Sequence, residues 1–342
     1  MTSLLTGGST TPAVRKPAFT VSFGSTSSDD WAKSLASVSV EAGLAPAVDV
    51  AEVVFSSRDD APKVSLGQTG SVALGFDDSS PSAVFSGEVR ALHHTVSGTS
   101  RLLASNGGAA LAALRVDQGY EQQGAGDIVK DLAGRTSTTV NATGSGPTLP
   151  YYVVDSRSTA WEHVAKLAAL SGFAAWLAPD GGLHFGPLQA GSPAQTFTYG
   201  QDILAIDAQE AAPLPGEVVV VGEGAAGSQG SDAWSWTIND ALPVTGSAGS
   251  GDPSVLVQDG ALRSADAVNG AAQGIATNAK LGALTARLLV TGAPAATVGA
   301  TVSVAGAPDD TLNGSWIVRG VRHRLVKTRG YTSLLLLAKG DT

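Results

Sequence analysis

The sequence contains no cysteine in its 342 residues. This absence excludes disulfide bridges, thiolate metal sites and cysteine nucleophiles. Aromatic residues make up only 6% of the chain and charged residues 15%, so small and aliphatic residues supply most of its bulk. No apolar run approaches the ~20 residues of a membrane span, and Met1–Pro12 has neither a cationic start nor the apolar stretch of a signal peptide. We therefore expect no signal peptide and no stable membrane insertion, and a chain of short strands and many turns.

The length and the residue patterns predict two or three domains. Residues 1–15 have low sequence complexity and are expected to form a flexible tail, and alternating strand patterns follow over 16–115. The centre, 116–210, mixes helical and strand patterns, and 211–342 returns to strands interrupted by one alanine-rich helix. We therefore expect a mainly β protein in which two small β-barrel domains flank a central α+β region.

The clearest helix is predicted from about Ser158 to Ser171. Thr159 and Glu162 have the spacing of a capping box, in which each side chain satisfies a free backbone N–H of the first turn. Glu162 and Lys166 have the spacing of an i,i+4 ion pair. A shorter helix is predicted to end at Gly134, which suits a left-handed cap.

Charge is distributed unevenly along the chain, whose net charge is −9. Residues 202–318 carry 12 acidic and 3 basic side chains, a net of −9, and residues 319–342 carry 1 acidic and 6 basic, a net of +5. The acidic balance argues against specific nucleic-acid binding. Two explanations stay open: an acidic surface that ends in a basic strand pair, or oppositely charged faces that meet in an assembly.

No pattern in the sequence predicts chemistry. The five histidines form no HExxH or HxH motif, and no GxSxG is present. Gly222–Gly227 matches GxGxxG after a strand, but a loop rather than a helix is expected to follow it, which argues against a dinucleotide site. The paired aspartates occur in turn-like contexts without the alternating oxygen ligands of a calcium loop. We therefore expect no catalytic residues, no metal site and no cofactor, and hence a protein that is not an enzyme.

Several short motifs, in order, are similar to those of the late control protein D family of tail hubs, which includes the hub of contractile phage baseplates and the N-terminal half of the VgrG spike. The likeness spans about 17–339, nearly the whole folded chain. Its motifs lie in the segments 84–89, 126–133, 158–173, 180–187, 298–299, 314–323 and 331–334.

The resemblance implies a homotrimer in which each chain contributes two similar barrels to a pseudo-sixfold ring. Such a ring would adapt a sixfold tail tube on one face to a threefold spike on the other. The expected partners are a hexameric tail-tube protein, other baseplate proteins and a separate spike protein, because no spike domain follows before Thr342. The expected place of assembly is the bacterial cytoplasm, as part of a phage tail or injection particle.

Charged residues on exposed strand faces are the candidates for contact with other subunits, the tube or the spike. Each of them has the alternative of a solvated surface charge. His323 matches a position of the family, where we expect a packed, hydrogen-bonded histidine. The candidates are Glu88, Arg90, Arg319, Arg322, Arg324 and Lys327.

Two other functions stay open. The chain could be a trimeric receptor- or carbohydrate-binding tail module, with Trp234, Trp236 and Trp316 stacking on sugars, although tryptophans on strands usually lie in the core. It could also be a hydrolase whose site is assembled from distant Asp and Glu residues.

Overall fold

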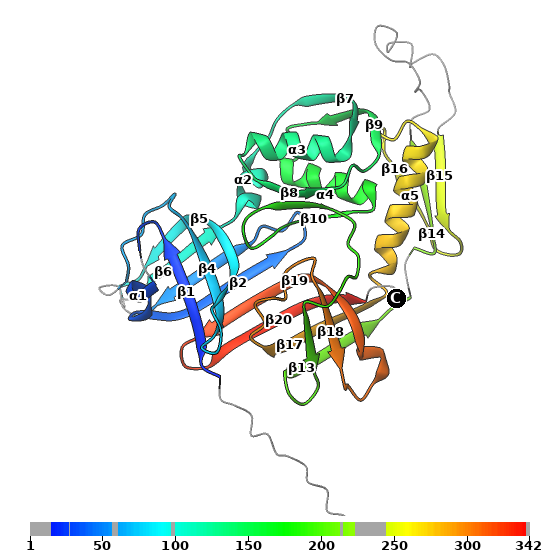
Figure 1. Ribbon diagram of the computed structural model, residues 1–342. Coiled ribbons are helices and arrows are strands. Elements are labelled where there is room, and N and C mark those ends of the chain that lie inside the picture. Colours follow the sequence, from blue (N-terminus) through cyan, green and yellow to red (C-terminus); the bar gives the residue numbers. More distant parts are fainter. Residues whose placement is uncertain are drawn as a thin grey trace, which may run out of the picture.

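The structure is a computed structural model that describes residues 15–26, 28–56, 61–96, 100–212, 215–222 and 244–339. Three sequence predictions fall outside these residues: the tail up to residue 14, the strand with Trp234 and Trp236, and the GxGxxG motif beyond Gly222. Strands dominate the described residues, and every helix there except the short first one lies in one central layer (Figure 1). The prediction of a mainly β protein with an α+β insert is confirmed.

The first β unit is a curved sheet in the strand order β1-β4-β5-β6-β3-β2. Its apolar side chains alternate along the strands and enclose one core, with Phe23 and Trp31 fully buried inside it. A short helix, α1 (Ser28–Ala32), lies against β1. The strands are β1 (Pro17–Phe23), β2 (Leu35–Gly43), β3 (Val50–Phe55), β4 (Thr69–Phe76), β5 (Ser82–His94) and β6 (Ser100–Ser105).

The second β unit continues the same sheet in the order β19-β20-β17-β13, with β18 and then β12 on another path from β19. Its own core contains Phe197, Trp316 and Leu335. The two units are joined because β2 pairs with β19. The strands are β12 (Gln195–Thr198), β13 (Ile203–Glu210), β17 (Leu284–Thr291), β18 (Thr301–Ala305), β19 (Gly314–Val326) and β20 (Gly330–Lys339), with the 3-10 turn η2 (Asp310–Leu312) before β19.

The central layer lies over both β units and has a third core (Figure 1). Its helices are α2 (Gly107–Ala113), α3 (Ala125–Arg135), α4 (Ala160–Ser171) and α5 (Ala265–Lys280). Its strands are β7 (Gln118–Gly124), β8 (Val140–Thr143), β9 (Thr148–Val154), β10 (Ala174–Leu177), β11 (Leu183–Gly186), β14 (Glu217–Gly222), β15 (Val244–Gly249) and β16 (Ser254–Gln258).

Core packing divides the chain differently from the expected segments 116–210 and 211–342. Strands β12 and β13, expected in the centre, pair with β18 and β17 of the second β unit. Strands β14–β16 and the alanine-rich helix α5, expected in the second barrel, pack with α4 in the central core. The physical reason is that the apolar faces of β14 and α5 meet the helices of the centre, as Val220 and Val268 show.

The local helix predictions are partly correct. The capping box is confirmed: Thr159 Oγ1 accepts from the backbone of Glu162, and the Glu162 carboxylate accepts from the backbone of Thr159. The end at Gly134 is wrong, because α3 runs to Arg135 and the backbone N–H of Thr136 closes it. The Glu162–Lys166 pair is also wrong, since the cap occupies Glu162 and Lys166 pairs with Asp259 at 2.8 Å.

Two glycines of α5 provide a matched test of its contact with α4. Gly274 is buried, and a Cβ there would lie 2.5 Å from the Cα of Gly172, the left-handed cap of α4 (φ +68°). Gly270 is exposed, and a Cβ there would meet nothing within 4 Å. We expect Gly274→Ala to lower the free energy of unfolding by about 1–3 kcal/mol through overpacking, and Gly270→Ala to raise it by about 0.5–1 kcal/mol. Urea denaturation followed by circular dichroism measures both, and equal effects would contradict this contact.

Candidate assembly surfaces

The junction between the two β units is an antiparallel pairing of β2 with the second half of β19. It runs from Gly43 opposite Gly320 to Ser37 opposite Val326. On the outer face Arg322 pairs with Glu41 at 2.6 Å. On the inner face Leu325 joins the core of the first unit. A sequence-predicted interface residue, Arg322, therefore connects the two units within one chain.

His323 lies under this junction. It is 1% exposed, and its Nδ1 lies 2.9 Å from Ser333 Oγ and 3.1 Å from the Tyr331 hydroxyl. Burial lowers its pKa to about 4, because the charged imidazolium would lose its hydration. The expectation of a packed, hydrogen-bonded histidine is confirmed.

The other basic candidates of this region lie along β19 and its turn. Arg319 is the bulged residue of β19, since the register with β20 shifts between Val318 and Gly320, and a bulge re-aims a side chain. Within the described part of the chain, Arg319 forms no ion pair or hydrogen bond. It lines one hollow with residues of β13, β17 and β20, and another with residues of α4. Arg324 is exposed, and Lys327 donates to the Ala32 carbonyl at 3.3 Å.

Glu88 and Arg90 lie on β5, and the strands β6, β3 and β2 separate them from β19. They pair with each other at 3.2 Å, and Arg90 also donates to Ser105 Oγ at 3.3 Å. Arg90, like Arg319, is a bulged residue, because the register with β6 shifts between Val89 and Ala91. The six candidates therefore form two groups on one sheet rather than a single patch.

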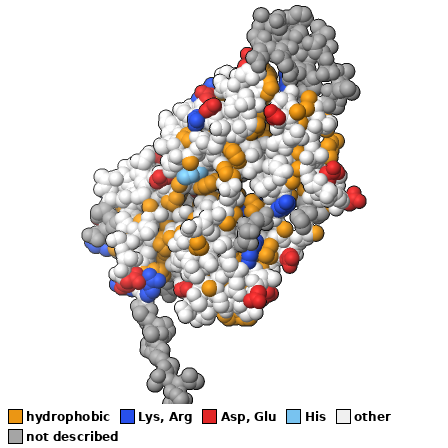
Figure 2. Space-filling view, turned by 45° about the vertical axis from the view of Figure 1, so that its right-hand side comes forward, with side chains coloured by type: hydrophobic (Ala, Val, Ile, Leu, Met, Phe, Trp, Pro, Cys, Tyr) orange, Lys and Arg blue, Asp and Glu red, His pale blue; other side chains and the backbone are white. Residues whose placement is uncertain are grey.

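On the face shown in Figure 2, acidic and basic side chains lie in small separate groups among uncharged atoms. Several basic groups have acidic partners close by, as in the pairs Arg101–Glu52 (2.9 Å) and Arg322–Glu41. Exposed pairs of this kind are worth only about 0–1 kcal/mol each, so they suit positioning better than stability.

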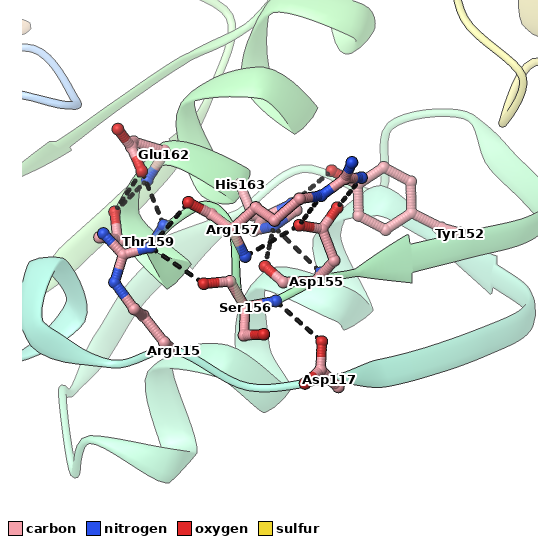
Figure 3. A network of polar contacts seen from close by, with 9 residues as sticks. All are labelled: Arg115, Asp117, Tyr152, Asp155, Ser156, Arg157, Thr159, Glu162 and His163. Atoms are coloured by element: carbon pink, nitrogen blue, oxygen red, sulfur yellow. Dashed lines mark hydrogen bonds and ion pairs between the residues drawn. The ribbon is translucent and has the colours of Figure 1, made fainter.

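A network of polar side chains surrounds the start of α4 (Figure 3). Arg115 donates to the carbonyls of Ser156 and Arg157 at 3.0 and 2.7 Å. The Arg157 side chain bonds Asp155 at 2.9 Å and lowers the pKa of that carboxyl to about 2. The remaining members, which bond one another or the backbone, are Asp117, Tyr152, Thr159, Glu162 and His163. Its contacts run within the chain and hold the loop before α4 in place.

Sequence reasoning missed a second buried titratable group, Asp49. Its carboxylate is 6% exposed and accepts from the Gly43 backbone at 3.0 Å and from the Asn106 amide at 2.6 Å. Burial raises its pKa to about 7. Asp49 and His323 line the same small hollow between the β units and the central layer. The sequence feature that indicates a buried acid here is the position of Asp49 between two valines, directly before β3.

Metal-ligating side chains do not gather in the described part of the chain. No group of three or more His, Asp or Glu side chains there could hold a metal ion. His184 stacks on Trp176, with ring centroids 5.1 Å apart. Of the helices in the described ranges, none is long and apolar enough to cross a membrane.

Comparisons with known proteins give a fold but no sequence relative. No protein-family profile matches the chain, and no curated protein does. A 43 kDa tail protein of prophage MuSo2 from Shewanella oneidensis is similar with a TM-score of 0.69 and 12% identity, over 94% of this chain and 98% of its own. A tail protein from Neisseria meningitidis MC58 is similar with a TM-score of 0.69 and 17% identity, over 95% and 97%.

A third similar structure is an E. coli component of the type VI secretion system, described as similar to the bacteriophage T4 tail proteins gp27 and gp5. Its TM-score is 0.60 at 12% identity, over 94% of this chain and 77% of its own. The chain thus has the fold of β-rich tail proteins. At the level of the fold, the predicted likeness to phage tail proteins and to a component of the type VI secretion system is confirmed.

Proposed function

We propose that the chain is a structural baseplate hub that adapts a sixfold tail tube to a threefold spike in a phage tail or contractile injection system. The observation that carries the proposal is the match to two tail proteins over nearly their whole length. In this proposal the protein acts by assembly rather than by catalysis.

The form of the sheet supports a homotrimer. The chain places two β units side by side in one sheet. Among the described residues, the edge strands β1, β12 and β13 each pair with one strand only. Unpaired edges are sites where another chain can add. Three chains with two units each supply six units, which match a sixfold tube while keeping threefold symmetry for the spike.

The partners in this proposal are a hexameric tail-tube protein, a separate spike protein and other baseplate proteins, and assembly takes place in the bacterial cytoplasm. Arg319, Arg322, Arg324 and Lys327 on one side, and Glu88 and Arg90 on the other, are the proposed polar contacts. The exposure of Arg90, Arg319, Arg322, Arg324 and Lys327 supports this role, and Glu88 is half-buried beside Arg90.

Electron-microscope class averages of the purified protein, alone and mixed with a tail-tube protein, test the proposal. We expect rings with threefold or pseudo-sixfold symmetry that bind to the end of the tube. A persistent monomer at micromolar concentration would contradict the hub. Trimers that bind glycans but have no affinity for the tube would instead support a receptor- or carbohydrate-binding module.

A further inference from the structure

The two β units repeat one another in strand order and hydrogen-bond register. The path β4-β5-β6-β3-β2 of the first unit corresponds to β18-β19-β20-β17-β13 of the second. The bulge at Arg90 on β5 corresponds to the bulge at Arg319 on β19. A second bulge, between Leu35 and Ser37 on β2, corresponds to the one between Ile203 and Ala205 on β13.

The turns before β4 and before β18 show which residues of the two units correspond. The Gly67 N–H donates to the Val89 carbonyl, and the Val89 N–H donates to Gln68, both at 2.9 Å. In the second unit Gly299, Val318 and Ala300 make the same two bonds at 2.9 Å. Both glycines have a φ of +82°.

In each unit, a histidine lies opposite a serine of the neighbouring strand, and the two strand pairs correspond. His94 is paired with Ser100 across β5 and β6, and His323 is paired with Ser333 across β19 and β20. The ring Nδ1 lies 3.5 Å from the serine Oγ in the first pair and 2.9 Å in the second. The alignment of the two units therefore rests on hydrogen bonds and register.

Corresponding residues differ in burial on one side of the repeat. Val298 of the second unit is 6% exposed, but its counterpart in the first, Leu66, is 63% exposed. Leu325 is 3% exposed, but its counterpart Val96 is fully exposed. His323 is buried and His94 is exposed. The first unit thus leaves uncovered the positions that the second unit buries.

The junction within the chain contributes to this burial in the second unit, since Leu325 joins the core of the first unit and Val298 lines a hollow with Ala42 of β2. Leu177 of the central layer lines the same hollow. The first half of β19 pairs with β18, and its second half, from Gly320, pairs with β2. β4 pairs with the first half of β5, up to Glu88. Beyond Glu88, no strand of the described residues pairs with this edge of β5. The counterpart of β2 is β13, and no strand of the described residues pairs with its outer edge. The chain therefore carries both halves of a second junction, on opposite ends of its sheet.

We propose that β13 of one chain pairs antiparallel with the second half of β5 of a neighbouring copy, in the register of the β2–β19 junction. This pairing buries Leu66, His94 and Val96. It rests on the proposed homotrimer and names the contact that closes it. Around the ring, junctions within a chain then alternate with junctions between chains. A head-to-tail contact of this kind generates a closed ring when the rotation that relates neighbouring chains closes.

The register follows from the junction within the chain. Arg322 lies opposite Glu41, and their counterparts are His93 and Gln209. His323 lies opposite Val40, so His94 lies opposite Ala208 of the next chain. The exposed Leu204 at the β13 bulge is part of the same interface.

A charge placed in the interface tests the proposal. Leu66→Asp would leave a buried, unpaired carboxylate between chains, and we expect the trimer to dissociate at least about a hundredfold more readily. Leu256→Asp on β16 is the matched control, because Leu256 is 67% exposed and lies outside the interface. Light scattering after size exclusion gives the mass, and circular dichroism checks that both variants are folded. A Leu66→Asp protein that stays trimeric would overturn the proposed contact.

Cysteine cross-linking tests the register, and the native chain has no cysteine to interfere. His93→Cys with Gln209→Cys should form disulfides between chains, because opposed residues of paired strands have the required separation. Glu41→Cys with Arg322→Cys is the control within a chain, at the corresponding position. His93→Cys with Asp207→Cys, displaced by two residues, should cross-link much less.

The outcomes separate this inference from the proposed function. A wild-type protein that is monomeric overturns the hub and the contact together. A wild-type trimer in which the displaced pair cross-links as well as the opposed pair, or in which neither does, leaves the hub standing and overturns the register. Interchain cross-links at the opposed pair, with the control pair linked within the chain, support both.

Discussion

Replacement of Trp161 by alanine is expected to lower the free energy of unfolding by about 3–5 kcal/mol, as for other fully buried tryptophans. Trp161 is 1% exposed in the central core, near the start of α4. Its indole N–H also donates to the Ala47 carbonyl at 2.9 Å, in the loop between β2 and β3. The side chain therefore joins the central layer to the first β unit, and its removal leaves both a cavity and an unpaired carbonyl.

Trp161→Phe is the matched control, since it keeps much of the ring volume but lacks the donor. We expect it to cost about 1–3 kcal/mol, the effect of the lost hydrogen bond to the Ala47 carbonyl together with some lost packing. Urea denaturation followed by far-ultraviolet circular dichroism, at one protein concentration, measures both variants. A loss below about 1 kcal/mol for Trp161→Ala would contradict its place in the core.

Local signals in the sequence predicted local structure. The capping box at Thr159 and Glu162 places the start of α4, because both partners lie within one turn. The alternating patterns over 16–115 predicted strands, and β1 is one of them, with Val21 and Phe23 buried on one face. The likeness to tail hubs predicted the fold class, which the similar structures share.

Long-range pairing could not be predicted in the same way. The partners β2 and β19 lie at opposite ends of the chain, and no local pattern records which strand pairs with which. The apolar run of β14 predicted a strand, but an apolar run does not show which layer buries it. Arg322 was a candidate for contact between chains, and its partner Glu41 on β2 became visible only with this pairing.

The repeat between the β units had a weak signal in the sequence. Gly67 and Thr69 are followed by Val89-Arg90, and Gly299 and Thr301 are followed by Val318-Arg319. Such short matches are common by chance in a chain with 42 glycines, and only the shared hydrogen bonds give them meaning. The burial difference between Leu66 and Val298 depends on tertiary packing, which periodicity does not record.

Stability should respond to pH in opposite directions when Asp49 or His323 is replaced. Burial raises the pKa of Asp49 from 3.8 to about 7, so between these values the folded state binds a proton that the unfolded state lacks. This group alone makes the protein less stable as pH rises. Burial lowers the pKa of His323 from 6.5 to about 4, so between these values the unfolded state binds the extra proton. This group alone makes the protein more stable as pH rises.

In the wild type the two effects oppose each other between about pH 4 and 6.5, and each corresponds to about 3 kcal/mol over that window. Asp49→Asn leaves the histidine effect unopposed, so we expect this variant to lose about 3 kcal/mol relative to wild type as pH falls from about 6.5 to 4. His323→Gln leaves the aspartate effect, so it should gain by a similar amount over the same change. Free energies of unfolding from urea titrations at about pH 4.5, 5.5 and 6.5 measure both slopes. Slopes that stay parallel to the wild type in both variants would show that neither buried group changes its protonation on folding, whereas slopes of opposite sign tie both side chains to the hollow where the first β unit, the second β unit and the central layer meet.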